Sequence, residues 1–239
     1  MYTTVVKVAD FIVEISHRYE YTRTLCNDYL YSGTEKAELF VSATEDDLCS
    51  EEAIAKEKHS RGFIESICIY RNLCLNLPQK DAFVMHGAAV AVDDKGYVFT
   101  AKSGTGKSTH ALLWCELLPN RAAIINGDKP IIRKKDGKFV IYGTPWSGKE
   151  GFNQNTGKEL FGVCFLERGE QNKISSLPKA DSAMRIMNQI LIPSTEEGVV
   201  KTFDLIDEMI NKTKTYKLSC NVSLEAARMS YECMSGEKL

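Results

Sequence analysis

Residues 100–109 read Thr100-Ala-Lys-Ser-Gly-Thr-Gly-Lys-Ser-Thr109. The two glycines, Lys107 and Ser108 match the second half of the phosphate-binding pattern G-x-x-x-x-G-K-[ST]. The first glycine of that pattern is replaced by Ala101, at the turn out of a strand, where alanine is a mild change. A loop of this kind presents successive backbone N–H groups at a helix N-terminus, where the helix dipole also favours phosphate.

The flanking residues supply the context that this pattern requires. Residues 96–101 are apolar and predict a short buried strand, and residues 107–118 predict a helix that ends before Pro119. Strand, glycine loop and helix therefore follow one another in the required order. A glycine turn that binds nothing is the alternative.

Each position of the loop has an expected role. Lys107 would reach the β- and γ-phosphates of a nucleotide, and the Ser108 hydroxyl would ligate Mg²⁺. The expected nucleotide contacts in the loop are Ser103, Gly104, Thr105, Gly106, Lys107, Ser108 and Thr109.

Size and composition indicate a globular protein. The chain has 239 residues, 44% of them apolar, which suits one large α/β domain or one domain with a small appendage. A net charge of −2 gives no indication of a nucleic-acid or membrane partner. Eight cysteines without a C-x-x-C pair are typical of buried thiols, and we find no signal-peptide pattern. We therefore expect a cytoplasmic protein.

The chain divides into two parts by pattern. Residues 1–80 predict strands over 3–15, 19–25 and 37–42, followed by a packing helix from about residue 51 to 77. Residues 81–239 predict the nucleotide-binding core, with hairpins turning at 93–96 and 136–137, and the two parts are expected to form one compact unit. An antiparallel strand feeding the loop makes the predicted sheet mixed. His17, among polar neighbours, is expected at the surface.

Two residues outside the loop are candidates for catalysis. An apolar strand over residues 121–126 leads to Asp128, whose carboxylate is expected beside the Mg²⁺ as metal ligand, as base for an incoming hydroxyl, or as both. A plain turn aspartate is the alternative. His86 begins the hairpin before the loop. It either contacts the phosphate or the acceptor, or is an ordinary buried histidine.

Two further cations are candidates with open alternatives. Lys149 and Glu150 lie in the glycine-rich segment 143–151, which is either a mobile flap over the site or a surface loop anchored by Trp146. Arg168 ends the apolar strand 161–166. It would neutralise a transferring phosphoryl group or form an ion pair with a neighbouring glutamate.

The order of His-Gly hairpin, phosphate loop and strand ending in Asp128 resembles the HPr kinase/phosphorylase family, whose fold is shared with the phosphoenolpyruvate carboxykinases. The resemblance runs from about Met85 to Arg168, with His86, Lys107, Ser108 and Asp128 as its moderately specific series. It implies a mixed-sheet P-loop kinase core and transfer of a phosphoryl group from ATP, with Mg²⁺, to a hydroxyl. The chain looks most like short, divergent members of the family.

Two departures from the family pattern keep the acceptor open. HPr kinases carry paired aspartates where this chain has Gly127-Asp128, and their long later signature is reduced to Glu167-Arg-Gly169. The acceptor is therefore a protein, a peptide or a small molecule. A nucleotide-binding sensor or scaffold without transferase activity is the second hypothesis, and a homo-oligomer stays open. Absent guanine-reading and transporter motifs argue against a GTPase and a transporter ATPase.

Overall fold

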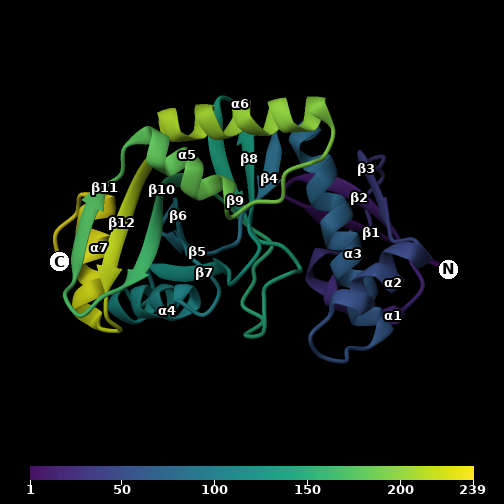
Figure 1. The fold of residues 1–239 in the computed structure, drawn as a ribbon, viewed down its shortest axis with the longest axis horizontal. Coiled ribbons are helices and arrows are strands. Elements are labelled where there is room, and N and C mark those ends of the chain that lie inside the picture. The colour runs from purple at the N-terminus through teal and green to yellow at the C-terminus, as the bar shows by residue number, and fades with distance from the viewer.

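Two β-sheets of unequal size organise the chain, and the computed structural model describes all of residues 1–239 (Figure 1). The small sheet has the strand order β1-β2-β3. The large sheet has nine strands, with the main path β4-β8-β9-β10-β6-β5-β7 and with β12 and β11 continuing from β10. The mixed α/β architecture with a small N-terminal sheet is as the sequence predicts.

The elements of the first part are the strands β1 (Tyr2–Val8), β2 (Phe11–His17) and β3 (Leu39–Ser42), the helices α1 (Glu20–Leu25), α2 (Glu45–Ile54) and α3 (Arg61–Asn76), and the short 3₁₀ helices η1 (Asn27–Tyr29) and η2 (Leu77–Lys80). The strands of the second part are β4 (Ala82–Val84), β5 (Gly87–Val92), β6 (Lys95–Thr100), β7 (Ala122–Asn126), β8 (Ile131–Lys135), β9 (Lys138–Tyr142), β10 (Gly157–Arg168), β11 (Lys173–Ser176) and β12 (Lys214–Cys220). Its helices are α4 (Lys107–Leu117), α5 (Lys179–Met187), α6 (Glu196–Lys212) and α7 (Leu224–Ser235).

The first part differs from the sequence expectation in four places, the first two of them at expected strands. The single strand expected over 3–15 is a hairpin, because Ala9 and Asp10 turn the chain with φ of 52° and 61°. The strand expected over 19–25 is the helix α1, whose Tyr21 ring packs edge-on against Phe63 of α3. Tertiary packing against α3 thus overrides the β propensity of this segment.

The single packing helix expected from residue 51 to 77 is two helices. Thr44 and Asp47 form a reciprocal capping box that starts α2, and the Ser60 side chain accepts from the Phe63 N–H to start α3. His17 is buried rather than exposed, because its ring bonds the Thr4 hydroxyl at 2.8 Å and the Tyr19 carbonyl at 2.9 Å.

Helices cover both faces of the large sheet (Figure 1). Successive strand side chains point to opposite faces, and β5 shows this alternation directly. Ala89 and Ala91 belong to the cluster under α5 and α6, whereas Ala88 and Val90 belong to the cluster under α4 and α7. Because both faces are covered, β5 is buried along its whole length and carries only small or branched apolar residues.

A third hydrophobic cluster joins the small sheet to the large one. It runs from β1, β2 and α3 into β4, β8 and β9. Polar contacts reinforce this joint: Arg133 on β8 donates to the Ala9 carbonyl at 2.7 Å, and its guanidinium lies 3.7 Å from the Phe11 ring centre. Asp10 accepts from Lys135 at 2.7 Å and from the Tyr142 hydroxyl at 2.8 Å.

The strand β5 sets the geometry of one sheet edge. It pairs antiparallel with both β6 and β7, so those two strands run parallel to each other. The loop after β6, the turn after β7 and the residue before β5 therefore leave the sheet at the same edge. These three points carry the phosphate-loop residues, Asp128 and His86.

All eight cysteines are free, and only half of them are fully buried. Cys26, Cys68, Cys74 and Cys164 are buried, whereas Cys49 and Cys233 are exposed. None of the helices combines the length and the apolar composition that crossing a bilayer requires.

Trp114 should be the main stabilising residue of the α4–α7 layer. It is fully buried against the rings of Tyr97, Phe99 and Tyr231, and its indole N–H donates to the Ser230 hydroxyl at 2.8 Å. We expect Trp114→Ala to lower the free energy of unfolding by about 3–5 kcal/mol in urea titrations. Leu112→Ala, at an exposed position of the same helix, should change it by less than about 0.5 kcal/mol. Equal losses in the two variants would contradict this assignment.

Candidate functional site: a phosphate loop beside a histidine–aspartate pair

The loop between β6 and α4 depends on two glycines for its shape. Gly104 and Gly106 have φ of 76° and 114°, a region that other residues adopt only with strain. A Cβ atom built on either glycine would meet no atom within 4 Å. Backbone conformation, not crowding, therefore requires glycine here, and the space beside the loop is open.

The first turn of α4 presents free backbone donors. No side chain caps this helix at Gly106, and the N–H groups of Gly106, Lys107, Ser108 and Thr109 make no hydrogen bond within the chain. The first N–H with a partner is that of His110, which donates to the Gly106 carbonyl at 2.9 Å. Such a cluster of unsatisfied donors at a helix N-terminus is suited to an anion.

The turn after β7 packs directly against this helix start. The Ser108 hydroxyl donates to the Gly127 carbonyl at 3.3 Å, which brings the following residue, Asp128, to the loop. Both Ser108 and Asp128 line one cavity of about 390 Å³. The other residues lining it are His86, Ser103, Gly104, Gly106, Lys107, Thr109, Gly127, Gly148, Lys149 and Glu150.

His86 and Asp128 form a pair in this cavity. The His86 Nε2 atom lies 3.2 Å from the Asp128 Oδ1 atom, and the Lys129 Nζ atom lies 3.6 Å from Oδ2. Burial by itself would raise the pKa of Asp128, but the hydrogen bond from His86 and the charges of Lys129 and Lys107 outweigh it. The pKa of Asp128 is therefore below its usual value, and the side chain is a carboxylate at neutral pH.

Lys107 is a mostly buried cation under the loop. Its Nζ atom donates to the Ala101 carbonyl at 3.4 Å, a long bond that leaves most of its donor capacity unused. Burial lowers its pKa, and the charge of Asp128 opposes that change. A bound polyanion would favour the charged ammonium further.

Asn126 is a structural component of the site that sequence reasoning missed. Its buried side-chain oxygen accepts from the N–H groups of Asp128 at 2.9 Å and Lys129 at 2.6 Å. Its amide nitrogen donates to the Thr144 carbonyl at 3.0 Å. The Asn126-Gly-Asp128 sequence, with an asparagine ending an apolar strand, is the signal that predicts such a turn.

The segment after β9 contributes Lys149 and Glu150 to the cavity, and its Trp146 anchors it. The Trp146 indole N–H donates to the Ser66 carbonyl of α3 at 3.0 Å, and its ring packs against Tyr70. Lys149 and Glu150 make no ion pair. The segment is thus fastened at Trp146 and carries two unpaired charges at the cavity rim.

Arg168 lies on the opposite side of the loop from Asp128. Its guanidinium donates to the Gly104 carbonyl at 2.5 Å, and it does not line the Asp128 cavity. Arg168 does not form an ion pair with Glu167. That glutamate pairs instead with Arg185 at 3.0 Å and with Lys217 at 2.8 Å. Arg168 therefore supports the wall of the loop. Thr105 likewise lies outside the Asp128 cavity.

His110, one turn into α4, is buried and uncharged. Burial lowers its pKa to about 4. Its Nε2 atom lies 2.9 Å from the Ser230 hydroxyl, whose own proton is directed to the Ala227 carbonyl. The neutral ring therefore carries its proton on Nε2.

A scan of the sequence against protein-family models finds no match, and a search of curated proteins finds none. Among solved structures, the chain is similar to the Hpr(Ser) kinase/phosphatase from Coxiella burnetii, with a TM-score of 0.32 and 11% identity. The similarity covers 54% of this chain and 91% of that one. A likeness of this size assigns no residue, so the functional argument rests on the geometry of this chain.

We expect Asn126→Ala to destabilise the Asp128 turn. The change leaves two backbone N–H groups without their buried acceptor. Each unsatisfied group should lower the free energy of unfolding by about 1–3 kcal/mol. Urea titrations measure this loss. Asn76→Ala removes an exposed amide–carbonyl bond and is the matched control, expected within about 0.5 kcal/mol of wild type. A wild-type value for Asn126→Ala would show that the turn forms without this side chain.

The neutral state of His110 should make stability depend on pH. The unfolded residue has an ordinary pKa of 6.5 and the folded one about 4, so between these values the unfolded chain binds the extra proton. Stability should therefore fall as pH is lowered from 6.5 to 4, by roughly 3 kcal/mol for this group. His110→Gln should flatten that part of the curve, and His59→Gln, at an exposed position, should not. Unfolding titrations across this range would reject the assignment if the two variants gave the same slope.

Proposed function

We propose that this protein is an ATP-dependent kinase that transfers the γ-phosphoryl group to a hydroxyl of a protein, a peptide or a small molecule. One observation carries the proposal. Free helix-start amides, the Lys107 cation, the Ser108 hydroxyl and the His86–Asp128 pair converge in a single cavity. The resemblance noted in the sequence points to the same reaction.

The loop would bind the donor through its backbone. The free N–H groups from Gly106 to Thr109 would hold the β-phosphate, and Lys107 would neutralise charge on the γ-phosphate. Donors held by the backbone at a helix start would stabilise developing charge with little reorganisation. Lys149, which lines the same cavity, would close over the phosphates.

The donor set near Ser108 fits a magnesium ion. The Ser108 hydroxyl and the Asp128 carboxylate are hard oxygen ligands, and Mg²⁺ completes its coordination with substrate phosphates and water. The chain contains no group of three or more His, Cys, Asp or Glu side chains that could hold a metal ion. Phosphate oxygens and water would therefore have to complete the coordination at this pair. When bound, the ion would neutralise charge on the phosphate oxygens.

The His86–Asp128 pair would orient the acceptor. As the acceptor oxygen forms its bond to the γ-phosphorus, the bond from phosphorus to the β-phosphate oxygen breaks and ADP leaves. The acceptor proton passes to the Asp128 carboxylate, which is ionised at neutral pH and oriented by His86 at 3.2 Å. Positioning and charge stabilisation then supply most of the acceleration.

A nucleotide-binding sensor without transferase activity is the second candidate. It is favoured by the single carboxylate of the Gly127-Asp128 turn, where the family that the sequence resembles carries two. Incubation with γ-labelled ATP and a panel of peptides and small hydroxy compounds separates the candidates. Transfer of label supports the kinase, whereas nucleotide binding without transfer supports the sensor.

Lys107→Ala should strongly lower nucleotide-dependent phosphorylation while the fold survives. Loss of a preorganised cation at the transferring group is expected to lower the rate by about 10²–10³-fold. The measurement is label transfer at saturating ATP, with the circular dichroism spectrum as the check on folding. Lys102→Ala, an exposed lysine of the same loop, is the matched control and should transfer at the wild-type rate. An equally active Lys107→Ala protein would remove the proposal.

A further inference from the structure

A second cavity lies on the other side of the phosphate loop. It has a volume of about 540 Å³, within the range of about 300–1,000 Å³ typical of small-ligand sites. It shares Gly104, Gly106 and Thr109 with the Asp128 cavity, so the loop forms a wall of both cavities. A ligand lying along the loop amides would reach into both.

The sheet decides which end of such a ligand lies where. β6, β10 and β12 are parallel, so the loops that follow them meet at one edge. The second cavity lies at this edge, lined by residues 166–170 at the end of β10 and just beyond it, and by residues 220–222 at the end of β12 and just beyond it. Asp128 lies on the other side of β6, beyond β5. The catalytic pair and the second cavity thus flank the phosphate loop on opposite sides.

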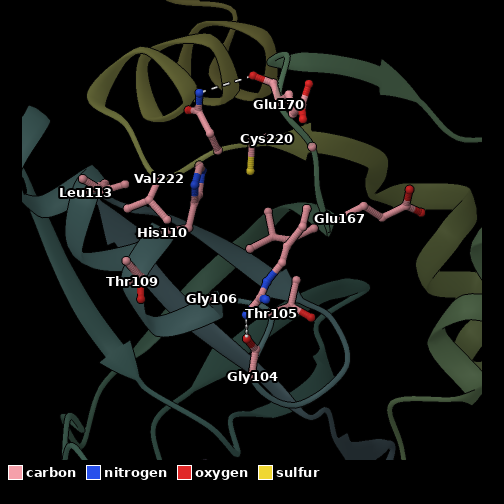
Figure 2. A pocket seen from close by; sticks show the side chains of 14 residues that line it. Gly104, Thr105, Gly106, Thr109, His110, Leu113, Glu167, Glu170, Cys220 and Val222 are labelled. Carbon is pink, nitrogen blue, oxygen red and sulfur yellow. Dashed lines mark hydrogen bonds between the residues drawn. The ribbon is translucent and has the colours of Figure 1, made fainter.

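One wall of the cavity is apolar, whereas Glu167, Arg168 and Glu170 are among its other lining residues. Figure 2 shows Leu113, Val222 and His110 grouped on one wall, with the Cys220 side chain beside the opening. The His110 ring is uncharged, as described above, and therefore acts as part of this wall. An apolar wall beside an uncharged imidazole ring suits a planar heterocycle.

Hydrogen bonds keep the cavity open. The Asn221 amide donates to the Glu170 carbonyl at a long 3.5 Å, between the loops after β12 and β10, and its oxygen accepts from the Ser223 hydroxyl at 2.6 Å. Arg168 holds the floor through the Gly104 carbonyl.

We propose that this cavity binds the base and ribose of the donor nucleotide, with its phosphates running over the loop amides toward Lys107 and Asp128. The inference rests on the proposed function, since it concerns the same donor. It places the nucleoside between α4 and the loop after β12, and it leaves the side of Asp128, Lys149 and Glu150 to the acceptor.

Val222→Trp tests the cavity without disturbing the core, because 74% of the Val222 surface is exposed. Binding of Mg²⁺-ATP is compared with binding of inorganic tripolyphosphate, which has the phosphates but no nucleoside. The wild type should bind ATP at least about tenfold more tightly, a difference of about 1.4 kcal/mol. Val222→Trp should remove that preference and leave tripolyphosphate binding unchanged. Val200→Trp, at an exposed position on α6, is the control and should keep the preference.

Cys220 gives an independent measurement on the wild-type protein. This partly exposed thiol lines the cavity, so ATP should slow its alkylation at least about threefold, whereas tripolyphosphate should not. Cys49 on α2 is exposed and is distant from the loop in the sequence. It should react at the same rate in all samples. Peptide mass spectrometry reports the two thiols separately.

The outcomes separate the two proposals. Equal binding of ATP and tripolyphosphate without protection of Cys220 overturns the nucleoside cavity and leaves the phosphate loop intact. Binding of neither compound overturns the proposed function and the cavity together. An ATP preference that Val222→Trp retains, with Cys220 unprotected, places the nucleoside elsewhere and also overturns this inference.

Discussion

The antiparallel pairing of β5 with both of its neighbours is the constraint on which the candidate site depends. It makes β6 and β7 parallel and brings the start of β5 to the edge where those two strands end. Three segments that are separate in the sequence, namely the start of β5, the end of β6 and the turn after β7, then meet within hydrogen-bonding distance. The Gly87 N–H donates to the Asp128 carbonyl at 3.0 Å, and the His86 carbonyl accepts from the Thr100 hydroxyl at 2.8 Å.

The charged and polar groups at this edge are of the kind that suits an anion. The amides at the start of α4 are unsatisfied, and Lys107 is held under them with a lowered pKa. Asp128 is a partly buried carboxylate of the cavity, and the hydrogen bond from His86 together with the charges of Lys129 and Lys107 lowers its pKa despite burial. Groups arranged in this way cost stability in the free protein and regain it when a charged ligand binds.

Local signals predicted the large sheet better than the small one. The hairpin turns at Asp93 and Asp136, with φ of 53° and 51°, follow from short polar turns between apolar runs. The strand, loop and helix around Lys107 follow from strong local patterns. The segment of α1 has the composition of a strand but packs as a helix on α3, and His17 is buried by partners distant from its own neighbourhood. Those two outcomes depend on contacts that no local window contains.

The sequence by itself determined the phosphate-loop pattern, the order of the core elements and the identity of the charged candidates, because each is encoded within about ten residues. Only the tertiary structure decided which candidates share a cavity. It brought His86, Lys149 and Asp128 to Lys107, and it placed Arg168 on the other side of Gly104. The role of Asn126 also emerged there. The physical reason is that strand order and pairing direction set which loop ends meet, and these depend on contacts between residues distant in the chain.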